Sequence, residues 1–294
     1  MNTTVEPLIN DEYTGDLPTK RVLAYLQTKR KEGKKIAGVY CGYAPAELIR
    51  AMDIVPATLC AFSNATIEAA ETVLPANLCP LIKSSYGFII TDTCPFYGIS
   101  DAVIGETTCD GKKKMFELIM DRKPTYIMDL PQLPDEKEAV ANWTVMIRKL
   151  QKFLEATFNA RATDEQIEDA IKDTNRKNAM MRKAIQFAAL DPPVVGWKEM
   201  YDLTFLAQGV NGAEIKSVLS EAIEKLEKRR EAGYVYGPDR APRVLVTGCP
   251  IAGDAKKVFN VIEEAGGVIV ALDACSGFKP YATDIEEDTD DPVK

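Results

Sequence analysis

The sequence predicts an α/β protein built on a doubly wound parallel sheet. Short apolar runs of strand length alternate with helical patterns over residues 1–134 and again near the end of the chain. This alternation is typical of βαβ units, whose crossover helices bring successive strands parallel. The 294 residues are enough for about two domains.

Residues 1–134 are expected to form an N-terminal α/β domain. Strands are predicted at 35–40, 54–60, 101–105 and 125–130, and helices at 18–32, 45–52, 64–74, 79–90 and 112–122. Ligands of such sheets bind beyond the carboxyl ends of the strands. Cys41 and Cys109 closely follow predicted strands, so we expect both at that edge. Cys79 should begin a helix, where backbone N–H groups and the helix dipole favour a thiolate.

Residues 135–236 are expected to form a helical insert, with long helices over 135–159 and 163–190. Thr163 and Gln166 have the spacing of a capping box that opens the second helix. Asp191-Pro192-Pro193 should end it.

Residues 237–294 are expected to begin a second α/β domain. A strand at 243–248, a helix at 254–265 and a strand at 267–273 form one predicted βαβ unit. One such unit cannot build a two-faced sheet, so we expect this domain to be incomplete. The acidic stretch 284–294 is expected to lack regular structure.

Composition and charge exclude several classes of function. There are 44 acidic and 36 basic residues, and the net charge of −8 argues against general binding of nucleic acid or anionic membrane. No apolar run approaches the length of a membrane helix, and Met1–Thr4 do not begin a signal peptide, so a cytoplasmic protein is expected. The chain has no histidine. This excludes a Ser-His-Asp triad, a Cys-His thiol enzyme and a zinc site with histidine ligands.

The cysteines carry the strongest chemical signal. There are seven, at positions 41, 60, 79, 94, 109, 249 and 275. An odd number without a Cys-x-x-Cys pair argues against a disulfide framework, a zinc ribbon and a thioredoxin motif. Cys79, Cys94 and Cys109 lie 15 residues apart, each beside turn residues, and this pattern suits thiolate ligands of an iron–sulfur cluster. The alternative is that they are small buried apolar residues. Cys60, in an apolar run, fits that alternative and is predicted to be core.

Two further motifs leave alternatives open. Residues 248–253 form a glycine-bearing turn that is either a plain tight turn or an anion site. The turn matches neither GxGxxG nor a Walker A motif, so no intrinsic ATP site is expected. Lys112, Lys113 and Lys114 begin a predicted helix, where positive charge opposes the dipole. They are either a solvated helix start or a cationic group of which at most two members face the cysteines.

Four segments resemble the 2-hydroxyacyl-CoA dehydratase component D family, most closely its double-cubane cluster protein branch. The segments are Tyr40 to Ile49, Leu74 to Gly87, Gly105 to Lys114 and Val246 to Ile251, within a similarity that covers roughly residues 18–290. The most specific stretches are Cys79-Pro80-Leu81-Ile82-Lys83-Ser84 and Thr107-Thr108-Cys109-Asp110-Gly111-Lys112-Lys113-Lys114.

The resemblance implies two Rossmann-like domains with an oxygen-sensitive iron–sulfur cluster between them. Dehydratase members carry one [4Fe–4S] cluster on three cysteines, and Cys79 and Cys109 match two of them. Double-cubane members carry an [8Fe–9S] cluster and need more thiolates, for which Cys41 and Cys94 are the candidates. The remaining ligands of the family are expected beyond Lys294, so we expect the printed chain alone to hold no complete double cluster. The implied partners are a separate ATP-hydrolysing iron–sulfur activator and a second subunit, identical or paralogous.

Three functions follow as hypotheses. The first is a reductase component of double-cubane type, which receives low-potential electrons from the activator and reduces a small substrate. The second is a subunit of a 2-hydroxyacyl-CoA dehydratase, a lyase that eliminates water through a radical. The third is a non-catalytic zinc-binding or structural protein.

Overall fold

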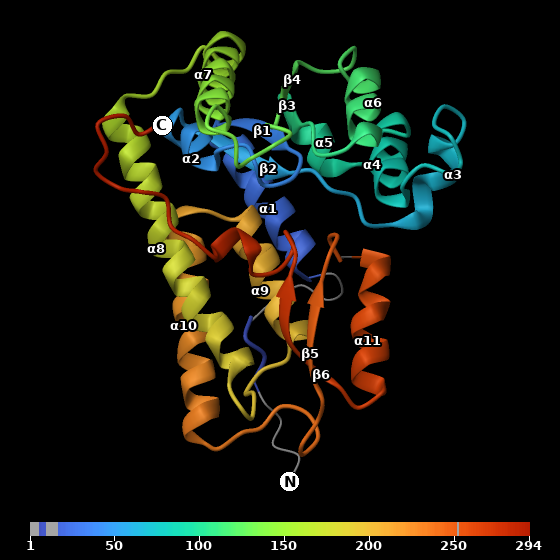
Figure 1. Ribbon diagram of the computed structural model, residues 1–294, viewed down its shortest axis with the longest axis vertical. Coiled ribbons are helices and arrows are strands. Elements are labelled where there is room, and N and C mark those ends of the chain that lie inside the picture. The colour runs from blue at the N-terminus through green and yellow to red at the C-terminus, as the bar shows by residue number, and fades with distance from the viewer. Residues whose placement is uncertain (1–5, 10–16, 252) are drawn as a thin grey trace. The chain divides into compact units, whose positions relative to one another are not determined.

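The computed structural model describes residues 6–9, 17–251 and 253–294, which belong to two compact units (Figure 1). The four-stranded unit comprises Tyr25–Lys172 and Glu286–Lys294, and the two-stranded unit comprises Met1–Ala24 and Asp173–Ile285. The three segments expected from the sequence, with boundaries after residues 134 and 236, do not coincide with these two units. Those boundaries stay a prediction. The expectations for Met1–Thr4 and for Ala252 in the 248–253 turn concern positions outside the described residues.

The four-stranded unit contains the parallel sheet that the alternating pattern predicts. Its strands are β1 (Lys35–Val39), β2 (Ile54–Thr58), β3 (Ala102–Glu106) and β4 (Thr125–Met128), in the order β2-β1-β3-β4. Every pair is parallel, and Val39 lies opposite Thr58 of β2 and Ile104 of β3. All four carboxyl ends therefore point to one edge of the sheet.

Helices cover both faces of this sheet (Figure 1). They are α2 (Ala46–Ala51), α3 (Ile67–Ala70), α4 (Pro80–Ile90), α5 (Pro95–Ile99), α6 (Asp110–Ile119) and α7 (Ala139–Phe158). Successive strand residues point to opposite faces. Val103 packs into one apolar cluster with residues of α4 and α6, and Ile104 packs into another with residues of α2 and α7. Burial on both faces explains why these strands are apolar runs rather than alternating ones.

The largest differences from the sequence prediction concern residues 64–74, the start of α7 and helix α5. The helix expected at 64–74 is a 3₁₀ turn, Asn64–Thr66, followed by the short α3. The next long helix, α7, begins at Ala139 rather than at 135, beyond Pro134. The sequence analysis did not identify α5.

The two-stranded unit contains the predicted βαβ motif. Strand β5 (Arg243–Thr247), helix α11 (Lys257–Glu264) and strand β6 (Val268–Asp273) follow one another, and the two strands are parallel. Helices α9 (Trp197–Gly209) and α10 (Gly212–Glu231) complete the unit, and α9 and α11 contact β6. The unit boundaries fall inside α1 (Leu17–Lys31) and α8 (Asp164–Ala189). Over the described residues, no helix is both long and apolar enough to cross a bilayer.

The capping box at the start of α8 is confirmed. The Thr163 N–H donates to Oε1 of Gln166 at 2.9 Å, and the Gln166 N–H donates to Oγ1 of Thr163 at 3.2 Å. Each side chain thus satisfies a backbone donor that the helix itself leaves unpaired.

The acidic segment at the end of the chain has no helix or strand beyond Tyr281, yet it is held in place. Within the four-stranded unit, Lys172 pairs with Asp288 at 2.6 Å and Arg148 pairs with Asp291. Val293 is only 6% exposed, in the same apolar cluster as Ile104. The segment lacks regular structure as expected, but contacts from outside the segment, which periodicity does not detect, fix its path.

Candidate functional site

Three cysteines follow the strands at the carboxyl edge of the four-stranded sheet. Cys41 comes two residues after β1, Cys60 two residues after β2, and Cys109 three residues after β3. Because these strands are parallel neighbours, their carboxyl ends meet at the same edge. The structure thus places Cys41 and Cys109 at the edge where parallel sheets bind their ligands.

Cys79 and Cys109 occupy the same local position, the residue that caps the start of a helix. Cys79 caps α4 and Cys109 caps α6, and neither side chain bonds to its helix. Both cysteines are exposed. Neither sulfur therefore has a hydrogen bond within its helix that would compete with a ligand.

The first turns of α4 and α6 lie against each other at Gly111. A Cβ atom at this position would be 2.7 Å from Cδ1 of Ile82 and 3.0 Å from Cδ1 of Leu78. Leu78 directly precedes Cys79, and Gly111 follows Cys109 by two residues. The absence of a side chain at Gly111 therefore lets the two cysteine-bearing helix starts approach closely.

Cys41 lies beside the same turn of α6. Its backbone has a φ of +58°, in the left-handed region. The Lys112 ammonium donates to the Cys41 sulfur at 3.0 Å. A hydrogen bond from Cys60, followed by the charge of Lys112 and its hydrogen bond, lowers the pKa of Cys41 from 9.0 to about 6 against the effect of burial. These contacts favour the thiolate form of Cys41.

Only the first residue of the lysine triplet points toward the cysteines. The Lys112 side chain is 12% exposed and bonds to Cys41 and Glu106. Lys113 pairs with Asp110, and Lys114 pairs with Glu117 at 2.8 Å, each three positions away along the helix. For these two, the solvated interpretation is confirmed. Only Lys112 matches the functional interpretation, in which lysines of the triplet face the cysteines. This agrees with helix geometry, which allows at most two of the three to do so.

Cys94 has a different environment. It caps α5, and its sulfur accepts a hydrogen bond from the Tyr97 N–H at 3.3 Å. The side chain is half-buried against the apolar cluster that contains Val103. Burial raises the pKa of the Cys94 thiol, which disfavours the charged form that metal binding requires. That Cys94 is a cluster ligand stays a prediction.

Cys60 has a contact that the sequence analysis missed. It packs against the same apolar cluster, as a core residue would, but it also hydrogen-bonds to Cys41. Register explains the meeting, because Val39 lies opposite Thr58 and each cysteine comes two residues later. The sequence held a signal for this contact. If the first two predicted strands are assumed to pair because they follow one another, Cys41 and Cys60 come to lie side by side.

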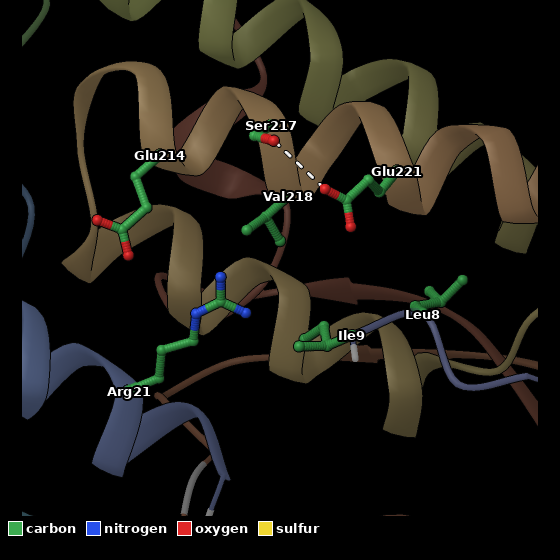
Figure 2. Close-up of a pocket in the computed structure, with 7 residues that line it drawn as sticks. All are labelled: Leu8, Ile9, Arg21, Glu214, Ser217, Val218 and Glu221. Carbon is green, nitrogen blue, oxygen red and sulfur yellow. Dashed lines mark hydrogen bonds between the residues drawn. The ribbon is translucent and has the colours of Figure 1, made fainter. Parts of the chain in front are cut away.

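The other two cysteines, Cys249 and Cys275, belong to the two-stranded unit. Cys249 is exposed, and Cys275 is half-buried next to Ser276. The same unit has a surface pocket of about 330 Å³ (Figure 2). Its charged lining consists of Arg21, Glu214 and Glu221, with no cysteine. This pocket offers no thiolate chemistry.

At the edge of the four-stranded sheet, the candidate metal ligands are cysteines. Among the described residues, no three Cys, Asp or Glu side chains surround one point as a mononuclear metal requires. Thiolates without histidine are the ligand type of iron–sulfur clusters. Cys41, Cys79 and Cys109 therefore match such a cluster in ligand type.

The pKa of Cys41 leads to a testable pH dependence. In the cluster-free protein, the rate at which iodoacetamide alkylates Cys41 should rise with pH around a midpoint near 6, because the thiolate is the nucleophile. Replacing Cys60 with alanine removes the largest stabilising contact of the thiolate and should move the midpoint to higher pH. Mass spectrometry of the peptide that contains Cys41 measures both. A midpoint near 9 in the unmodified sequence would contradict this assignment.

Comparison with known proteins agrees with the resemblance seen in the sequence. The family model described as "2-hydroxyglutaryl-CoA dehydratase, D-component" matches residues 41–294. A protein of Escherichia coli (strain K12), named "Putative dehydratase subunit YjiM", is 37% identical over 252 residues. The alignment covers 85% of this chain but 65% of that relative, so the chain spans about two thirds of the relative's length.

Proposed function

Because the chain belongs to the 2-hydroxyglutaryl-CoA dehydratase D-component family, we propose that it is the iron–sulfur component of an enzyme of this family. The observation that supports the proposal most directly is the pair of exposed cysteines, Cys79 and Cys109, on the adjoining first turns of α4 and α6. When bound, the cluster supplies one-electron transfer at low potential. Cys79 and Cys109 would hold it at the carboxyl edge of the sheet.

Cys41 supports the double-cubane form of the proposal. A single cubane of the family's dehydratase type needs two cysteines from this part of the chain, and Cys79 and Cys109 meet that need. Cys41 is a third thiolate at the same sheet edge, with a pKa of about 6. A larger cluster would use it. In this form, the protein receives electrons from an ATP-dependent activator and reduces a small substrate.

The description of the family favours a second candidate, a subunit that dehydrates a 2-hydroxyacyl-CoA. The name of the Escherichia coli relative agrees with it. This candidate uses the same two cysteines, and it differs in needing about four irons and in its substrate. In both cases we propose that electrons come from a separate activator, since the sequence has no Walker A loop of its own. A second subunit, identical or paralogous, completes the proposed assembly.

Iron and acid-labile sulfide analysis of the whole protein, purified without oxygen, tests the proposal. About eight irons per chain are expected for the double-cubane form and about four for the dehydratase form. Turnover of a 2-hydroxyacyl-CoA in the presence of activator and ATP would decide for the dehydratase. Zinc without sulfide, or no metal at all, would overturn the proposal and leave a structural protein.

A further inference from the structure

A buried ion pair lies where β3 runs into α6. The Glu106 side chain is 1% exposed and the Lys112 side chain 12% exposed, and the Lys112 ammonium bonds to Oε1 of Glu106. The other carboxylate oxygen, Oε2, accepts the Thr108 N–H at 2.9 Å. A buried carboxylate is stable only when it is paired and hydrogen-bonded, so Glu106 fixes the position of the ammonium.

The Lys112 ammonium has two further acceptors. Its contacts are Glu106, Oγ1 of Thr108 at 3.1 Å and the sulfur of Cys41 at 3.0 Å. An ammonium group has three N–H donors, and these three acceptors account for all of them. Because the first two acceptors flank the start of α6, the third donor is held toward Cys41.

The position of this lysine is costly for the helix itself. Cys109 caps α6, so Lys112 is the third residue of its first turn, where a cation opposes the helix dipole. Lys113 and Lys114 avoid this cost at the surface by pairing with carboxylates on their own helix. Lys112 instead bonds to the buried Glu106 and to a thiolate. The negative charges of these two groups offset the unfavourable position.

We propose that Lys112 is a positioning residue for Cys41: held by Glu106, it donates a hydrogen bond to the Cys41 sulfur and places a positive charge beside it. The inference rests on the proposed function, in which Cys41 is a cluster ligand. Hydrogen bonds and positive charge at a ligand sulfur raise the reduction potential of an iron–sulfur cluster. Lys112 would therefore make the cluster easier to reduce.

The first test uses the cluster-free protein and is independent of cluster binding. Lys112→Met should slow the alkylation of Cys41 by iodoacetamide at pH 5 about fivefold, because the thiolate loses a charged donor and its fraction limits the rate at this pH. Lys112→Arg keeps a cation and should restore most of the rate. Lys113→Met and Lys114→Met remove the same charge from the same turn and serve as matched controls, with unchanged rates expected. If Cys41 is alkylated at the same rate in Lys112→Met as in the protein without substitutions, the inference is overturned.

Lys112→Met leaves Glu106 buried without its cation, so the single variant could fail to fold. The double variant E106Q/K112M removes both charges at similar shape, and circular dichroism checks its fold. It should show the same slowed alkylation. A double variant that is folded and reacts at the unmodified rate would also overturn the inference.

The second test uses the protein loaded with iron and sulfide. A potentiometric titration followed by electron paramagnetic resonance should show a more negative reduction potential in Lys112→Met than in Lys113→Met. An equal potential in the two loaded variants would overturn the role of Lys112 toward the cluster. Failure of the unmodified protein to bind iron would instead count against the proposed function, while the alkylation rates still decide whether Lys112 acts on Cys41.

Discussion

Replacing Cys109 with alanine is expected to lower the iron content of the protein by more than about tenfold. Cys109 is an exposed helix cap without a competing hydrogen bond, and its helix start adjoins that of Cys79. Loss of either thiolate opens a corner of the cluster to solvent and oxygen. Cys79→Ala should therefore have the same effect. Iron, acid-labile sulfide and visible absorbance after anaerobic purification measure it.

Asp110→Asn is the matched control for this prediction. Its side chain is 99% exposed and belongs to the same turn of α6, but it carries no sulfur, so the iron content should stay unchanged. Retention of iron in both Cys79→Ala and Cys109→Ala would contradict the proposed ligand set. Cys94→Ala decides a separate question. Loss of iron would make Cys94 a ligand, whereas retained iron with a modest loss of stability would leave it as the cap of α5.

Replacing Gly87 with alanine is expected to destabilise the four-stranded unit by about 3 kcal/mol. A Cβ atom there would lie 2.0 Å from the carbonyl oxygen of Thr66 and 2.7 Å from the Thr66 Cβ. The first clash is with backbone, which cannot rotate away as a side chain can. The Thr66 hydroxyl also donates to the Ser84 carbonyl oxygen at 3.0 Å, so moving α4 to relieve the clash would break this bond.

Hydrogen exchange measures this effect where it arises, without assuming that both units unfold together. Peptides that cover α4 should exchange about a hundredfold faster in Gly87→Ala, since every 1.4 kcal/mol changes the opening equilibrium tenfold. Gly98 is the matched control, because it is also helical and has nothing within 4 Å of a Cβ atom. Gly98→Ala should leave exchange in α4 unchanged. Equal exchange rates in the two variants would show that the approach of α4 to Thr66 is not tight.

The local structure of this protein could largely be predicted from its sequence. Apolar runs separated by helical patterns predicted the parallel strands, and the succession of strand, helix and strand predicted the motif at residues 243–273. Thr163 and Gln166 predicted the start of α8. The apolar pattern of residues 79–90 predicted that Cys79 begins a helix. These features depend on neighbours within a few residues, so periodicity and capping chemistry are enough to find them.

What the sequence could not show were the meetings between residues far apart along the chain. The strand order decided that Cys60 lies beside Cys41 rather than only in the core. The packing of α4 against α6 decided at which glycine the two cysteine-bearing helix starts adjoin, and Glu106 decided which of three adjacent lysines faces Cys41. Ion pairs with Arg148 and Lys172 held an acidic segment that has no periodicity. In each case the partner comes from another element, and only the tertiary packing of the elements selects it.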